Sequence, residues 1–284
     1  MKDLKDYVLC CIDGSSVTPA VCDYAGWIAK TIEAPLRVLH TIEQQQTPAV
    51  SDFSGALGLG TSEDLLNELA EVEKSHSRLQ IKKGELMLNA SKERLIANGI
   101  EQVDVRQRHG SLSESLIELE EQIKFLVIGI RGEEHDDSDG GIGRQLETVI
   151  RAMHKPILVV NKEFTEPKTI MFACDGSDVC KKALTMIATN SLFSKLHCHV
   201  VHVGEDGEAL LEGAAAMLRE AGNPVTVAQL SGQAEEALAQ YQRDQQIDLT
   251  VMGAFSHNRF RGFLLGSFTA KMLGATRRPL LLLR

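Results

Sequence analysis

The feature that most constrains the fold of this chain is an internal duplication. An apolar run that ends in Asp-Gly-Ser occurs twice, as YVLCCIDGS at 7–15 and as TIMFACDGS at 169–177. The same order of apolar runs and amphipathic segments follows each of them, and each series closes with a proline, Pro156 or Pro279, before a final apolar run. Repetition of so long a unit indicates two copies of one domain in a single chain.

Each copy alternates short apolar runs with segments of helical periodicity. Near-continuous apolar runs are typical of strands buried on both faces of a parallel sheet, with helices covering both faces. The alternation therefore predicts an α/β fold with two doubly wound, parallel, five-stranded, Rossmann-like sheets. Strands are expected at 7–12, 36–42, 102–109, 125–130 and 157–160, then from Thr169 and at 196–203, 224–230, 249–252 and 279–283. Helices are expected at 18–33, 63–98, 112–123, 178–189, 207–221 and 233–243, with two more that begin at Gly143 and at Gly266-Ser267.

The domain boundary is expected in a polar segment that ends in proline, NKEFTEP at 161–167. Such a composition is typical of a linker. We therefore expect a first domain at 1–160, a linker at 161–167 and a second domain at 168–284.

The first copy is longer than the second. Asp13 and Asp175 are 162 positions apart whereas Pro156 and Pro279 are 123 apart, which leaves 39 additional residues in the first copy. A polar loop and a long charged helix, together 43–98, account for this insertion. We expect one long, largely solvated helix, with a break near Gly84 left open, and a charged outer face in preference to a partner-binding surface.

Composition excludes several classes of function. The chain has 284 residues, 43% hydrophobic and 24% charged, which is typical of a globular protein. A formal net charge of -9 argues against nucleic acid or an anionic membrane as the main partner. No apolar run approaches the roughly 20 residues of a membrane span, and the N-terminus lacks a secretory pattern, so a cytoplasmic location is expected.

The cysteines fit this location. None of the six forms a Cys-x-x-Cys pair, so we expect buried free thiols in preference to disulfides or zinc ligands. Three histidines, His197, His199 and His202, alternate along one strand or its end, but no carboxylate or cysteine completes a ligand set, and no metal site is expected.

The strongest candidate for a binding site is the segment LTVMGAFSHNRFRGFLLGSFT at 249–269. An apolar strand meets Gly253, a polar and basic loop follows, and Gly266-Ser267 opens a helix. Glycine lets a ligand approach the backbone, and a helix N-terminus offers unpaired N–H donors with a positive dipole end, which suits phosphate. The cationic side chains of the loop are His257, Arg259 and Arg261.

The spacing of this segment resembles the nucleotide-binding signature of the universal stress protein family, Gly-x2-Gly-x9-Gly-Ser/Thr, with Ser256 in place of the second glycine. The Asp after the first strand and the Pro before the last strand extend the resemblance over nearly the whole chain. It implies an adenine-nucleotide α-hydrolase-like fold that binds ATP or another adenine nucleotide, with or without Mg. In the second copy the resemblance implies Asp175 and Val203 near adenine and ribose, Met252 and Ala254 lining the site, and Gly253, Ser256, Gly266, Ser267 and Thr269 around the phosphates. His257, Arg259 and Phe268 complete the predicted binding residues, with a role as solvated loop charges left open for the two cations.

The first copy departs from this pattern. Gly129 and Gly132 are in place, but Gly143 follows after ten residues instead of nine, and Arg144 stands where the other copy has Ser267. The intervening loop carries five carboxylates, which should repel a polyphosphate and predict a degenerate site. They are Glu133, Glu134, Asp136, Asp137 and Asp139. For Asp13 a turn or helix-capping role is expected ahead of ligand contact.

The sequence contains no catalytic constellation, so a regulatory or sensing module is the preferred function. Slow ATP hydrolysis, or autophosphorylation with Ser267 as acceptor, stays open, as does a nucleotide-free protein-interaction scaffold. Enzymes of the wider fold group carry Ser-Gly-Gly-x-Asp-Ser or His-x-Gly-His after the first strand, whereas this chain reads DGSSVTP and DGSDVCK.

Family members dimerise through the last strand of each sheet. The resemblance therefore implies that ILVV (157–160) and PLLLL (279–283) pair inside one chain as an intramolecular pseudo-dimer, with further homodimerisation left open.

Overall fold

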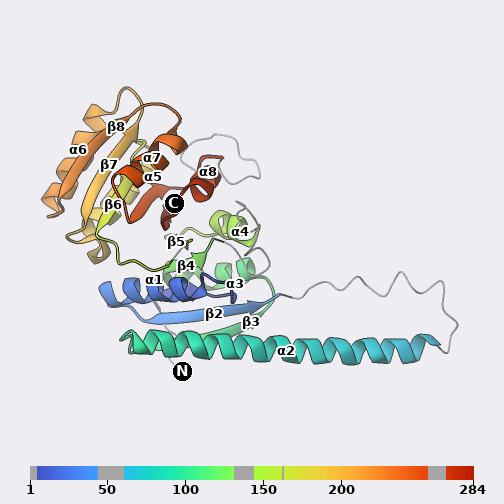
Figure 1. Ribbon diagram of the computed structural model, residues 1–284. Coiled ribbons are helices and arrows are strands. Elements are labelled where there is room, and N and C mark those ends of the chain that lie inside the picture. The colour runs from blue at the N-terminus through green and yellow to red at the C-terminus, as the bar shows by residue number, and fades with distance from the viewer. Residues whose placement is uncertain (1–4, 44–60, 131–143, 162, 255–266) are drawn as a thin grey trace.

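The computed structural model describes residues 5–43, 61–130, 144–161, 163–254 and 267–284. In these residues ten strands form one continuous sheet in the order β3-β2-β1-β4-β5-β10-β9-β6-β7-β8 (Figure 1). The first half contains β1 (Tyr7–Cys11), α1 (Thr18–Thr31), β2 (Leu36–Ile42), α2 (Thr61–Ala97), β3 (Val103–His109), α3 (Leu112–Leu119), the 3-10 turn η2 (Glu120–Gln122), β4 (Ile123–Gly129), α4 (Arg144–Ala152) and β5 (Ile157–Val160). The second half contains β6 (Thr169–Ala173), α5 (Asp178–Thr189), the 3-10 turn η4 (Ser191–Phe193), β7 (His197–Val203), α6 (Glu208–Glu220), β8 (Val225–Leu230), α7 (Ala234–Asp244), β9 (Leu249–Gly253), α8 (Ser267–Ala275) and β10 (Leu280–Leu283).

The two predicted parallel sheets are present, and their last strands join them. All other neighbouring strands are parallel, but β5 and β10 are antiparallel, with Leu281 opposite Leu158. The expected pairing of these two strands inside one chain is therefore confirmed. We call the β5–β10 pair the seam.

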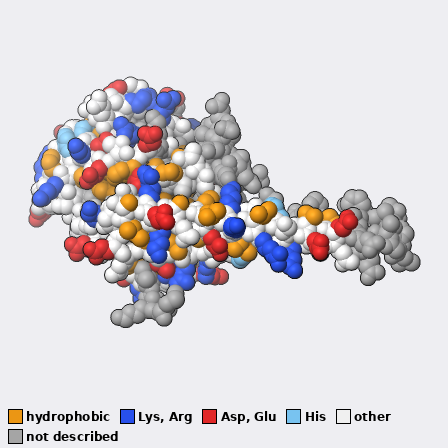
Figure 2. Space-filling model, turned by 60° about the horizontal axis from the view of Figure 1, so that its bottom comes forward, with side chains coloured by type: hydrophobic (Ala, Val, Ile, Leu, Met, Phe, Trp, Pro, Cys, Tyr) orange, Lys and Arg blue, Asp and Glu red, His pale blue; other side chains and the backbone are white. Residues whose placement is uncertain are grey.

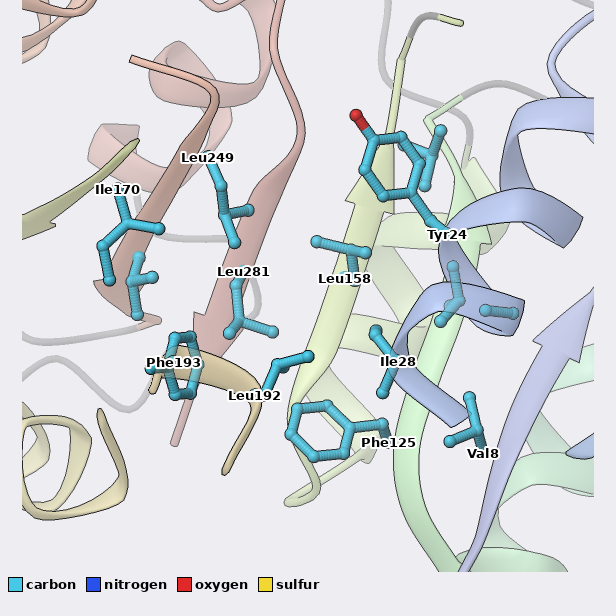
Figure 3. Packing of buried hydrophobic residues seen from close by; sticks show 14 of the residues in the cluster. Val8, Tyr24, Ile28, Phe125, Leu158, Ile170, Leu192, Phe193, Leu249 and Leu281 are labelled. Carbon is cyan, nitrogen blue, oxygen red and sulfur yellow. The ribbon is translucent and has the colours of Figure 1, made fainter. Parts of the chain in front are cut away.

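Alternation along the strands divides the core into two layers. Leu158 and Leu281 face one side, where buried residues of α1, α2, α5, α6 and η4 pack, and this layer contains residues of both halves (Figure 3). Ile157 and Leu282 face the other side, where α3, α4, α7 and α8 pack. Because successive strand residues point to opposite faces, each five-stranded half is covered by helices on both sides.

The segment between the halves packs on the first half. The Tyr24 hydroxyl lies 3.3 Å from both the N–H and the carbonyl oxygen of Thr165, and the Tyr24 ring stands edge-on to Phe164 with ring centroids 4.8 Å apart. These contacts attach part of the predicted linker to α1.

Helix α2 is continuous through Gly84, which confirms the single long helix and excludes the break that the sequence left open. A Cβ atom added at Gly84 would lie 2.6 Å from Nδ1 of His40 and 2.1 Å from Nε2 of Gln107. Glycine is needed at this position because α2 approaches the sheet closely there, and the helix continues through it because packing outweighs an intrinsic penalty of about 1 kcal/mol.

Gly84 within α2 and Gly99 after its end have counterparts at Gly207 and Gly222 around α6. Gly84 precedes Gly99 by the same number of residues as Gly207 precedes Gly222. Gly99 and Gly222 both have positive φ, +84° and +88°, and both end their helix with the following N–H bonded back into the last turn. Helix α6 therefore corresponds to the part of α2 that follows Gly84, and the 39 additional residues of the first half all precede Gly84.

We expect Gly84→Ala to destabilise the protein by about 1–2 kcal/mol in urea unfolding, because the added methyl overlaps the His40 ring by more than helix propensity offsets. Gly213→Ala is the matched control, since a Cβ at this exposed glycine within α6 meets nothing within 4 Å. It should stabilise the protein by about 0.5–1 kcal/mol. Equal stabilisation by both substitutions would contradict the close approach at Gly84.

Within the described residues, no helix combines the length and the apolar character needed to cross a membrane. All six cysteines are buried and free, in agreement with the expectation from their spacing.

Candidate functional site

The sheet order places a switch point in each half. In the second half the chain passes from β6 to β7 and β8 on one side, then returns to β9 on the other side of β6. Ligands of doubly wound sheets bind at this change of direction, beyond the carboxyl ends of the strands. Phe172 of β6 pairs with Val251 of β9, so the segment that holds Asp175 leaves the sheet beside Gly253. In the first half the equivalent position lies between β1 and β4.

Asp175 forms the turn between β6 and α5. Its Oδ1 accepts a hydrogen bond from the N–H of Ser177 at 3.0 Å, and Gly176 takes the left-handed backbone conformation with φ +76°. The Ser177 hydroxyl accepts the N–H of Cys180 at 3.1 Å and caps α5. Asp175 therefore forms an Asx-type turn, and Ser177, not Asp175, caps α5.

Asp13 occupies the same turn in the first half. Its Oδ1 is within hydrogen-bond distance of the Ser15 N–H (3.0 Å), the Ser15 hydroxyl (2.7 Å) and the Thr18 hydroxyl (3.3 Å). These contacts supply the structural role that the sequence predicted for Asp13.

Two thiols lie beneath the Asp175 turn. Cys174 and Cys180 are buried, and their sulfur atoms are 2.9 Å apart. The contact with Cys174, together with hydrogen bonds from the N–H groups of Gly176 and Asp175, lowers the pKa of Cys180. The same contact and burial raise the pKa of Cys174. Of the two thiols, Cys180 is therefore the one that loses its proton first.

His202 is a residue of this site that sequence reasoning missed. Its Nδ1 lies 2.8 Å from the carbonyl oxygen of Cys174, and because a carbonyl only accepts, Nδ1 carries the proton. The ring fills the space above Gly207, where an added Cβ would lie 2.3 Å from Cδ2 of His202. His202 therefore ties the end of β7 to the Asp175 turn and to the start of α6.

The duplication contains a signal for this histidine. Cys10 pairs with Val38 in the first half and Phe172 pairs with Val200 in the second, which makes His40 and His202 equivalent. Each ring lies against the glycine of the following helix, Gly84 or Gly207. In both halves a histidine follows the valine by two residues and packs against a glycine. This repetition indicates a shared packing role, which could be found only by comparing the two copies.

The other two histidines of β7 have different neighbours. His197 Nε2 lies 2.8 Å from the Thr226 hydroxyl, and His199 Nδ1 lies 2.8 Å from the Tyr241 hydroxyl. Burial, and then the neighbouring His197, lower the pKa of His199. The residues that the structure describes include no group of three or more His, Cys, Asp or Glu placed to hold a metal ion.

The remaining predicted residues fall into two groups. Val203 and Phe268 are partly buried at the ends of β7 and α8, Met252 and Thr269 are buried, Gly253 ends β9, and Ser267 begins α8 as predicted. Ser256, His257, Arg259, Arg261 and Gly266 lie outside the described residues, as does the acidic loop of the first half with Gly132 and Gly143.

The fold and the two switch points define a tandem, doubly wound α/β protein in which each half places an aspartate turn beside the fourth strand of its sheet. The chain belongs to the universal stress protein family, because the model of that family matches it twice, at residues 6–161 and 166–284.

Similarity to known proteins extends over the full length. The chain is 37% identical to the universal stress protein Slr1230 of Synechocystis sp. (strain ATCC 27184 / PCC 6803 / Kazusa), over 98% of this chain and 99% of that one. Its fold resembles a universal stress protein from Archaeoglobus fulgidus DSM 4304, with TM-score 0.69, 18% identity and coverage of 98% and 96%. It also resembles a putative universal stress protein from Pseudomonas aeruginosa UCBPP-PA14, with TM-score 0.62, 14% identity and coverage of 98% and 93%.

Proposed function

We propose that the second half binds an adenine nucleotide, ATP ahead of others and with or without Mg, and that the protein acts as a regulatory or sensing module. The observation that carries this proposal is the position of the Asp175 turn beside Gly253, at the switch point between β6 and β9. Family membership supports it, and so does the glycine and serine spacing of residues 253–267.

The donors of the crevice fit the parts of a nucleotide. A carboxylate accepts hydrogen bonds from ribose hydroxyls and repels phosphate, so Asp175 suits the nucleoside end. Val203 and Phe268 are partly buried apolar side chains suited to a base. N–H groups at the start of α8 would hold phosphate, with Gly253, Ser256, Gly266 and Ser267 beside them and His257 and Arg259 as cationic donors. A bound Mg ion would supply further neutralisation of the phosphate charge.

One nucleotide per chain is expected. The first half has the same turn at Asp13, but its sequence places five carboxylates and Arg144 where the second half has a basic loop and Ser267. We propose that the first half does not bind nucleotide because this charge opposes a polyphosphate.

The test is to denature freshly purified protein, quantify the released nucleotide and then titrate the stripped protein with ATP and Mg. We expect about one adenine nucleotide per chain, and a loss of affinity of at least about tenfold in Ser267→Asp, because the new carboxylate faces phosphate. Arg144→Asp is the matched control at the start of α4 and should leave the affinity unchanged. Two nucleotides per chain would overturn the assignment of a degenerate first half.

The alternatives give different results in the same experiment. Absence of released nucleotide, together with no thermal stabilisation by ATP and Mg, would favour a nucleotide-free interaction scaffold. Slow hydrolysis or autophosphorylation would release ADP, and autophosphorylation would add one phosphate, with Ser267 as the candidate acceptor identified by mass spectrometry. A cytoplasmic location belongs to this proposal and is tested by cell fractionation.

A further inference from the structure

The first part of α2 has no counterpart in the second half. We call residues 61–83, which precede Gly84, the arm. Every residue from Asn67 to Leu79 is exposed, and the arm extends beyond the sheet (Figure 1). Most helical stability in proteins comes from packing of an apolar face, and the exposed residues 67–79 have no such packing within one chain.

The arm and the first residues after Gly84 carry apolar side chains at coiled-coil spacing. Val72, Leu79 and Leu86 follow one another at intervals of seven residues, with relative exposures of 65%, 64% and 63%, and Leu69 beside them is 39% exposed. We call these four residues the apolar stripe. Hydrophobic side chains interrupt the charged surface along α2 in the space-filling view (Figure 2). The sequence expectation of a merely solvated outer face does not account for this stripe.

The apolar stripe faces away from the body of the protein. Between residues 67 and 97 of α2, the buried residues are Gly84, Leu88, Ser91 and Leu95. At 3.6 residues per turn these lie about 120° around the helix from the stripe. A second helix can therefore approach the stripe without displacing α2 from the sheet.

We propose that the apolar stripe is a dimerisation surface, on which the arm of a second copy of this chain packs antiparallel as a two-stranded coiled coil. Placing Val72, Leu79 and Leu86 at the d positions of the heptad makes Leu69, His76 and Lys83 the a positions. In the antiparallel alignment Leu69 packs against Leu79 of the second copy, and Val72 packs against His76.

Charge selects the antiparallel orientation. In a parallel pair, Lys83 of one copy would face Lys83 of the other in the core of the coiled coil. Glu68 of each copy would also face Glu73 of the other. In the antiparallel pair Glu68 faces Lys82 of the second copy, and symmetry makes this contact twice. The antiparallel pair retains one like-charge approach, between the two Glu73 side chains at its centre.

Length and position also suit a second copy. This alignment overlaps residues 61–87 of the two helices, which is about four heptads and enough to sustain a coiled coil. The bodies of the two copies lie at opposite ends of the overlap, because each body begins at its own Gly84. Strands β5 and β10 already pair with each other within one chain, so the proposed dimer does not use these strands.

Light scattering on the full chain, as a dilution series across micromolar concentrations, tests the association. We expect twice the 31.1 kDa chain mass for the unaltered protein and a single-chain mass for Val72→Glu/Leu79→Glu. Ser77→Glu/Glu71→Gln is the control, since it alters charge on the arm outside the stripe and should leave the dimer intact. The exposure of all four positions means that the circular dichroism spectrum should stay unchanged in every variant. A single-chain mass for the unaltered protein, or a dimer that survives the double glutamate substitution, would overturn the proposal.

Charge reversal tests the orientation. Glu68→Lys and Lys82→Glu should each weaken dimerisation by about tenfold, because two attractive contacts become repulsive. The combined Glu68→Lys/Lys82→Glu variant should recover the affinity of the unaltered chain, since the pairs are restored with exchanged signs. Dimerisation that stays weak in the combined variant would overturn the antiparallel arrangement.

Discussion

Leu281→Asp is expected to destabilise the whole protein by at least about 4 kcal/mol, because it introduces an unpaired carboxylate into the dry core. Leu281 is 1% exposed, pairs with Leu158 in the seam and belongs to the core layer that both halves share. For a chain of this size the thermal midpoint should fall by about 10 °C or more. The measurement is a melt followed by far-UV circular dichroism.

Ile117→Asp is the matched control for this prediction. It makes the same chemical change on α3 at a side chain that is 55% exposed. Surface substitutions of this kind change stability by about 0.5 kcal/mol. If Leu281→Asp lowered the midpoint no more than Ile117→Asp does, the seam would not be part of the cooperative core.

Phe193→Ala is expected to cost about 3–5 kcal/mol and to lower the unfolding midpoint of both halves together. Phe193 is fully buried in η4, and Leu192 beside it extends toward Leu281 and Phe125, so this turn of the second half packs at the boundary with the first (Figure 3). The Ser191 hydroxyl also donates to the carbonyl oxygen of Thr31 in α1, at 3.2 Å. A cavity at Phe193 therefore weakens packing that both halves depend on.

The single tryptophan makes this coupling measurable. Trp27 lies in α1 of the first half, so its fluorescence reports that half in urea unfolding, while circular dichroism reports the whole chain. Phe193→Ala should shift both midpoints equally, and Phe193→Leu, which keeps most of the volume, should shift both by a smaller amount, about 1 kcal/mol. If Phe193→Ala left the urea midpoint measured by Trp27 fluorescence unchanged, the two halves would unfold independently.

The fold was predictable from the sequence because its signals are local and repeated. Apolar runs such as 36–42 and 157–160 coincide with strands β2 and β5, and each Asp-Gly-Ser turn follows a first strand. The sequence left a break at Gly84 open because the reason for that glycine is tertiary. The closeness of His40 on a strand 44 positions earlier cannot be seen from helix propensity.

The switch point of each sheet was predictable from the sequence, but the contacts that support the turn beside it were not. The switch point follows from strand order, which alternation of strands and helices already implies. The contact of His202 with the Cys174 carbonyl depends on how β7 and β6 are registered, and the pairing of Cys174 with Cys180 depends on the turn between β6 and α5. Similarly, the exposure of the apolar stripe depends on which face of α2 the sheet covers, which the charge-rich composition of the helix conceals.

The seam has a consequence for how this protein can evolve. In a dimer of identical subunits, every mutation appears in both copies, so neither binding crevice can change without the other. Here the two partners of the strand pair are separate stretches of a single polypeptide, and a mutation in one leaves the other as it was. Covalent fusion also fixes their ratio at one to one and keeps them together at any dilution. One crevice can therefore keep a basic loop while its counterpart accumulates acidic residues, and one half alone can acquire a long helical extension.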